Sequence, residues 1–121
     1  MLDISMEFKK GILFVRLKGV INGDNSQILN DNLTNIVKDN GIKYLLLNFE
    51  NVDYIDQYGI NIIVDNYNTI TANRGKMILC GFHKILNYNI SPLDNLYQIN
   101  EERNAFGLIN LWLRLSLMML Y

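Results

Sequence analysis

Three short, nearly continuous apolar segments, separated by stretches of helical periodicity, constrain the fold of this chain most strongly. They cover residues 12–17, 44–49 and 77–82, and such segments are typical of strands buried on both faces of a sheet. Between them, two stretches repeat their apolar residues at helical spacing. The alternation predicts an α/β protein in which a small mixed sheet carries helices packed on it.

Both predicted helices have recognisable ends. The first covers residues 26–40, where Asn25 or Ser26 is expected to cap the free amides and Gly41 to provide a left-handed end. The second begins at Gly59 and ends at Arg74-Gly75. Its predicted buried face consists of Ile60, Ile63, Val64, Tyr67, Ile70 and Thr71.

The remaining segments are predicted from weaker patterns. Residues 3–9 alternate apolar and polar, which indicates a half-buried strand that pairs as a hairpin with residues 12–17 across Lys10-Gly11. Residues 19–25 and 51–58 are expected to be connections. After residue 82 we expect a short helix over 83–89, a turn at Ser91-Pro92, a strand at 96–99 and a last helix that begins near Glu101-Glu102.

Composition excludes several classes of protein. A chain of 121 residues is expected to form one domain, and 11 basic against 12 acidic side chains argue against a general nucleic-acid binder or a polybasic membrane-surface protein. Cys80 and His83 are the only cysteine and histidine, which excludes a disulfide framework and a Cys/His zinc site. The lone thiol and the amino-terminal sequence, which does not resemble a secretion signal, predict a cytoplasmic protein.

The sequence predicts no catalytic residue, cofactor or metal. Cys80 lies within an apolar strand, where a thiol behaves as a small hydrophobic group, and His83 is expected to be an ordinary loop residue. The glycine-rich motifs that bind nucleotide phosphates do not follow any predicted strand. A binding protein is therefore favoured over an enzyme.

The junction between the strand at 44–49 and the second helix has a distinctive form. Asp56 can cap the helix, which leaves Gln57 and Tyr58 exposed at its positive end, where a partner protein could contact them. Alternatively, Asp56 is only a cap.

Several segments together resemble the STAS domain, and within it the single-domain bacterial anti-sigma factor antagonists that control sporulation or stress sigma factors. The similarity spans about residues 2–106 and is carried by residues 14–19, 43–52, 55–60, 74–77 and 93–97. It implies a small mixed sheet with helices mainly on one face. It also implies binding of an anti-sigma factor of the serine-kinase type, which releases a sigma factor. In such proteins, phosphorylation of a Ser at the start of the second helix breaks the complex because it adds charge to the interface.

This chain departs from that pattern at the switch itself. The usual Asp-Ser-Ser-Gly is Asp56-Gln57-Tyr58-Gly59 here, so Tyr58 occupies the phosphoacceptor position, and Asn22 replaces an acidic loop residue for which Asp24 could substitute. We therefore expect partner binding without Ser phosphorylation. The predicted partner-binding residues are Asn22, Asp24, Asn25, Asp56, Gln57, Tyr58, Gly59 and Ile62.

Other interpretations of this site and family remain open. Tyr58 could itself be phosphorylated, or it could be an exposed aromatic residue that only covers the helix start. The alternative functions are a STAS scaffold protein of a stress-signalling assembly and a STAS subunit of a lipid-transport ABC complex.

Residues 107–121 form an apolar tail after the predicted domain of residues 1–106. The tail is shorter than the roughly 20 residues of a spanning helix. One helical stripe is predicted from Leu108, Leu111, Trp112, Leu115, Met118 and Met119, but the other side is apolar too. We expect packing on the sheet with possible homo-oligomers, or docking to a partner or a membrane surface.

Overall fold

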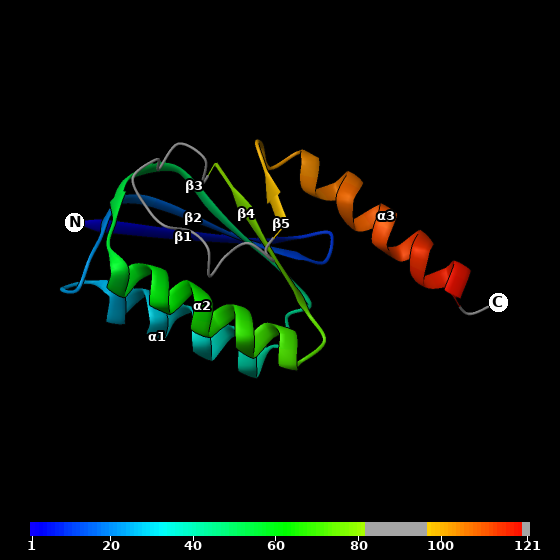
Figure 1. Cartoon of the computed structure of the whole chain (residues 1–121), viewed down its shortest axis with the longest axis horizontal. Helices are drawn as coiled ribbons and strands as arrows, with labels where there is room; N and C mark the ends of the chain where they lie inside the picture. The colour runs from blue at the N-terminus through cyan, green and yellow to red at the C-terminus, as the bar shows by residue number, and fades with distance from the viewer. Residues whose placement is uncertain (82–96, 120–121) are drawn as a thin grey trace.

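The structure is a computed structural model, and it describes residues 1–81 and 97–119. These residues form a five-stranded sheet in the order β1-β2-β3-β4-β5, with α1 and α2 on one face and α3 on the other (Figure 1). The elements are β1 Leu2–Lys9, β2 Ile12–Ile21, α1 Ser26–Asp39, β3 Tyr44–Ile55, α2 Gln57–Ala72, β4 Lys76–Cys80, β5 Tyr97–Ile99 and α3 Asn104–Met119. The predicted mixed sheet is confirmed.

The strands pair as the connections require. Strand β1 is antiparallel to β2, and the turn between them places both Lys10 and Gly11 at positive φ, as a type I′ hairpin turn does. Strands β2 to β5 are parallel to one another. Because α1 and α2 follow parallel strands β2 and β3, both helices begin at the same edge of the sheet.

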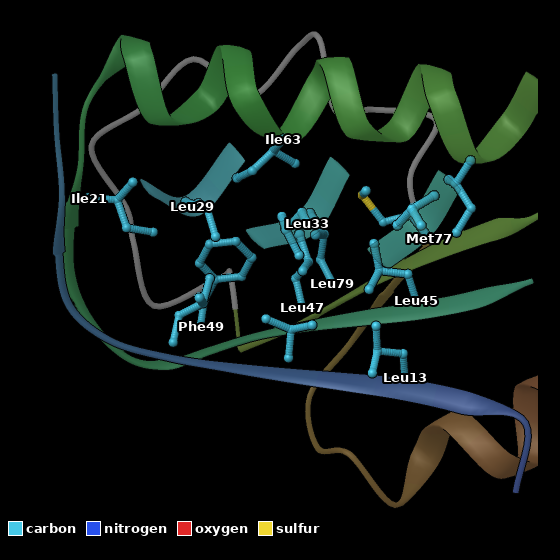
Figure 2. Packing of buried hydrophobic residues seen from close by; sticks show 14 of the residues in the cluster. Leu13, Ile21, Leu29, Leu33, Leu45, Leu47, Phe49, Ile63, Met77 and Leu79 are labelled. Atoms are coloured by element: carbon cyan, nitrogen blue, oxygen red, sulfur yellow. The ribbon is translucent and has the colours of Figure 1, made fainter. Parts of the chain in front are cut away.

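The central strands are buried on both faces, as their continuous apolar sequences predict. Alternate residues of β2 and β3, including Leu13 and Leu45, pack under α1 and α2 together with Leu29, Leu33 and Ile63 (Figure 2). The intervening residues face α3, in a second cluster that contains Ile12, Phe14, Leu46, Ile78, Cys80, Ala105 and Ile109.

Two predicted connections are shorter than expected because the strands continue into them. Strand β2 extends to Ile21 and β3 to Ile55, and these two residues still pair in the parallel ladder. Asn51 and Asp53 lie on exposed positions of β3, so their polarity does not indicate a loop. The extension moves the ends of β2 and β3 to the edge where the helices start.

The buried face of α2 differs from the predicted one at two positions. Thr71 is exposed, whereas Asn66 is 1% exposed. The Asn66 amide donates to the Ile62 carbonyl at 2.9 Å and to Asn30 Oδ1 of α1 at 3.4 Å. A polar side chain is tolerated here because α1 supplies a hydrogen-bond partner across the helix interface. The predicted ends of both helices are confirmed by the left-handed φ of Gly41 and Arg74.

Among the side chains that the structure describes, most of the stripe predicted on the tail lies on the exposed side of α3. Leu111, Leu115 and Met118 are exposed, and α3 instead buries Ala105 and Ile109. Trp112 continues this face and packs against the rings of Tyr44 and Tyr97. The small Ala105 lies where the helix meets the sheet, and side chains at i, i+4 and i+7 share its face.

Helix α3 begins at Asn104, so residues 107–119 continue a helix that starts within the predicted domain. The helix that the sequence predicts near Glu101-Glu102 begins just after these residues, and no acidic residue lies in its first turn. The predictions for His83, for residues 83–89 and for Ser91-Pro92 fall outside the described residues.

Candidate functional site

The candidate site lies at the edge where β2 and β3 end and α1 and α2 begin. The last ladder hydrogen bond between the strands runs from the Asp56 amide to the Ile21 carbonyl, at 3.0 Å. Beyond it, the chain leaves β2 through the loop at residues 22–25 and enters α2 directly from β3. The register of two parallel strands therefore brings together segments that are more than 30 residues apart.

Asp56 connects these two segments through its carboxylate. Its Oδ1 atom accepts a hydrogen bond from the Gly59 amide at 3.0 Å, which confirms the predicted cap of α2. Its Oδ2 atom accepts a hydrogen bond from the Gly23 amide of the loop, also at 3.0 Å. The same side chain thus caps a helix and fixes the loop beside it.

Within the loop, two asparagine side chains hold the backbone. Asn22 Oδ1 accepts from the Asp24 amide at 3.0 Å, whereas Asn25 Oδ1 accepts from the Asn22 amide at 2.9 Å and Asn25 Nδ2 donates to the Val20 carbonyl at 2.8 Å. The prediction that the Asn25 side chain caps α1 is wrong, because it makes no cap hydrogen bond and is used by the loop instead. Asp24 is exposed.

Tyr58 and Gln57 are exposed in the first turn of α2, as predicted. The Tyr58 side chain is 66% exposed, and its ring lies so close to Gly23 that a Cβ atom built there would be 3.3 Å from Tyr58 Cδ2. Gln57 donates to Asn61 Oδ1 along the outer side of the helix at 2.9 Å. The aromatic ring therefore covers the loop that Asp56 holds in place.

The other two predicted site residues face the interior. Gly59 is buried, and a Cβ atom there would lie 2.6 Å from Ile55 Cγ1 and 2.8 Å from Ile21 Cγ2. Ile62 is partly buried against the main core. The structure thus brings all eight predicted residues to this part of the fold, but Gly59 and Ile62 lie mainly against the core.

Sequence reasoning missed two exposed hydrophobic residues near this edge. Tyr54 is 48% exposed near the end of β3, and Ile28 is 56% exposed in the first turn of α1. Tyr54 could have been found if the buried Val52 and Ile55 had been interpreted as a continuation of the strand.

A second polar group lies on the α3 face of the sheet. Arg16 Nε donates to Glu102 Oε1 at 2.8 Å and its Nη2 atom donates to Glu7 Oε1 at 2.9 Å, while Asn48 Nδ2 also donates to Glu102 Oε1. The hydrogen bond from Arg16 lowers the pKa of Glu102, and the two carboxylates raise the pKa of Arg16. Arg16, Asn48 and Glu102 line an open polar depression of about 470 Å³ and tie β2 and β3 to the segment before α3.

Cys80 is fully buried, as its position in an apolar strand predicts. Burial, with a smaller effect from the Glu50 carboxylate, raises the pKa of its thiol to about 12, so the thiol stays protonated and is a poor nucleophile at neutral pH. Among residues 1–81 and 97–119, there is no cluster of three potential His, Cys, Asp or Glu metal ligands. In the same part of the chain, none of the helices combines the length and apolar character needed to cross a membrane.

Comparisons with known proteins agree on one family. The STAS domain family model matches residues 3–93. An anti-sigma F factor antagonist of Paenibacillus polymyxa is 27% identical over 79 residues, which cover 65% of this chain and 68% of that protein. These likenesses confirm the resemblance found in the sequence.

Solved structures agree with this assignment of the fold. An anti-sigma factor antagonist from Mycobacterium paratuberculosis aligns with a TM-score of 0.75 at 14% identity, over 91% of this chain and 95% of that one. The phosphorylated form of SpoIIAA, a Bacillus cell fate determinant, aligns with a TM-score of 0.68 at 15% identity, over 88% and 99% of the two chains. At these identities, the likeness shows a shared fold.

Proposed function

The chain belongs to the STAS domain family, and from this premise we propose that it is an anti-sigma factor antagonist. In this role it binds an anti-sigma factor of the serine-kinase type and so releases a sigma factor. The named relative from Paenibacillus polymyxa supports the role, because it is an anti-sigma F factor antagonist. The action is by protein binding in the cytoplasm, without direct contact to nucleic acid.

The observation that carries the proposal is the double hydrogen bond of Asp56. Asp56 accepts hydrogen bonds from both the Gly23 amide and the Gly59 amide. It thereby joins the loop at 22–25 and the start of α2 into one continuous surface. A partner that binds this surface meets a preorganised backbone, so little conformational entropy is lost on binding.

Three exposed hydrophobic side chains at this edge supply candidate contacts. Tyr58 lies at the start of α2, Tyr54 near the end of β3 and Ile28 at the start of α1. Each is about half exposed or more. Aromatic residues that become buried at an interface often contribute a large share of the binding energy. We assign Tyr58 as the main anchor because it is the most exposed of the three and lies over the loop.

In this proposal the chain binds its partner without the usual serine phosphorylation switch. Tyr58 occupies the phosphoacceptor position, and its phenol oxygen lies a whole ring farther from the backbone than a Ser hydroxyl does. Ser26, which begins α1 beside the loop, is only 7% exposed. A serine kinase therefore has no accessible serine hydroxyl at residues 20–26 or 56–62, and binding is controlled by other means.

The binding surface is tested by titration calorimetry with a purified serine-kinase-type anti-sigma factor from the same organism. We expect wild type to bind and Tyr58→Ala to bind at least tenfold more weakly. The matched control is Phe8→Ala, because Phe8 is 63% exposed but lies beside the hairpin turn, at the other end of the sheet. Absence of wild-type binding would refute the function, and equal losses in both variants would refute the surface.

The switch is tested separately by mass spectrometry after incubation with the same partner and Mg-ATP. We expect no phosphate on Ser26, which is the only serine within residues 20–26 and 56–62. A phosphoserine there would overturn the absence of the usual switch, and phosphate on Tyr58 would show that the tyrosine has taken over the acceptor role.

A further inference from the structure

Helix α3 extends beyond the sheet that supports it. Its first half is anchored by Ala105 and Ile109, and Trp112 stacks on Tyr44 and meets the edge of Tyr97. After Trp112, every side chain that the structure describes on this helix is exposed. Figure 1 shows the second half of α3 continuing away from the strands. A short helical segment without tertiary contacts is marginal in water, so its apolar side chains call for a partner.

The exposed side of α3 carries a regular apolar stripe. Leu108, Leu111, Leu115 and Met118 are separated by three, four and three residues, which is the spacing of the a and d positions of a coiled coil. Leu111 is 52% exposed, Leu115 48% and Met118 72%, while Leu108 is partly buried against the cluster on the α3 face of the sheet. With this spacing, the side chains of a second helix can pack between those of the stripe.

Charge restricts what that partner can be. Arg114 is the only charged side chain between residues 104 and 121. Helices that lie on anionic membranes normally carry several Lys or Arg residues on their polar side, and pairing with a charged protein surface would need complementary charges. An uncharged stripe with a and d spacing is instead complementary to itself.

We propose that the stripe formed by Leu108, Leu111, Leu115 and Met118 packs against the same stripe of a second copy of this chain, so that the protein forms a two-fold dimer through α3. The contact is isologous, since each copy contributes the same side chains. The sheet already holds the first half of each helix in place, which lowers the ordering cost of association. The proposal does not depend on the anti-sigma partner.

The dimer leaves the candidate binding site free. The starts of α1 and α2 lie at one end of the molecule, whereas the second half of α3 lies toward the other end (Figure 1). Each dimer therefore presents two sites. Because the stripe covers only about two heptads, the interface is small, and we expect a weak dimer with a dissociation constant of roughly 10–100 µM.

Sedimentation equilibrium of the full chain between about 1 and 500 µM tests the dimer. Leu115→Gln should weaken dimerisation about tenfold or more, because it places a polar group in the centre of the stripe. Leu113→Gln is the matched control, since Leu113 is 50% exposed but points to another side of α3. It should change the dissociation constant less than about threefold. Circular dichroism should show folded protein for both variants.

Three outcomes would overturn the proposal. The first is a wild-type protein that stays monomeric up to the highest concentration, and the second is an equal effect of the two substitutions on dimerisation. The third is binding of the monomer to phosphatidylglycerol vesicles that is lost in Leu115→Gln and kept in Leu113→Gln, which would assign the stripe to a lipid surface instead.

Discussion

Replacement of Gly59 by alanine tests how tightly the start of α2 packs on the sheet. Alanine is favoured over glycine within helices by about 1 kcal/mol, so propensity alone predicts stabilisation. The added Cβ atom, however, would lie 2.6 Å from Ile55 Cγ1 and 2.8 Å from Ile21 Cγ2, and both isoleucines are fully buried. Overpacking of a core costs about 1–3 kcal/mol, and two such overlaps place this site at the upper end. We expect the free energy of unfolding to fall by about 2 kcal/mol after the helix gain is subtracted.

Urea unfolding at pH 7 measures this change, with Gly107→Ala as the control. Gly107 also lies in a helix, but a Cβ atom there has no neighbour within 4 Å, so only the propensity gain applies. We expect Gly107→Ala to raise the free energy of unfolding by about 1 kcal/mol. The packing argument would be refuted if Gly59→Ala were as stable as wild type or more stable.

Two further predictions concern the α3 face of the sheet. Glu102→Gln should lower the free energy of unfolding at pH 7 by about 1 kcal/mol, because it removes the charge-assisted bonds from Arg16. Pairing lowers the pKa of Glu102 in the folded protein, so its contribution is present above the unfolded-state pKa and is lost as the pH falls through the folded-state pKa. Urea unfolding of both proteins at pH 7 and pH 3 should therefore show the difference shrinking in acid, and a growing difference would contradict the pairing. Cys80, whose thiol pKa is raised to about 12 by burial, should resist an aromatic disulfide reagent at pH 8 until guanidinium unfolds the protein. Rapid modification of the native protein would contradict its burial.

Most of the fold could be predicted from local sequence patterns. The central elements were identified from the continuous apolar segments of β3 and β4 and from the helical spacing of Leu29 and Leu33. A strand buried on both faces has a continuous apolar sequence, and a helix buried on one side repeats its apolar residues at helical spacing. The end of β3 was missed because Asp53 and Tyr54 are exposed strand residues, so the apolar pattern of a buried strand is lost there. Polarity alone does not separate such an exposed strand from a loop.

The candidate site was predictable only in part, for a related reason. Asp56 was recognisable as a helix cap because its partner, Gly59, is three residues away. Its second hydrogen bond joins Gly23, 33 residues earlier, and exists only because β2 and β3 pair in a particular register. The role of Asp56 in fixing the loop is therefore a property of the tertiary structure.

The sequence by itself determined which segments become strands and helices, the hairpin at Lys10-Gly11, and the short motif at the start of α2. These depend on backbone propensity and on the period of apolar residues, which are local. Only the tertiary structure decided which side of α3 is buried, because that helix is apolar all round and the sheet selects the face of Ala105 and Ile109. It also decided that Arg16 meets Glu102, 86 residues away, because an ion pair forms where the fold brings opposite charges together, whatever their separation along the chain.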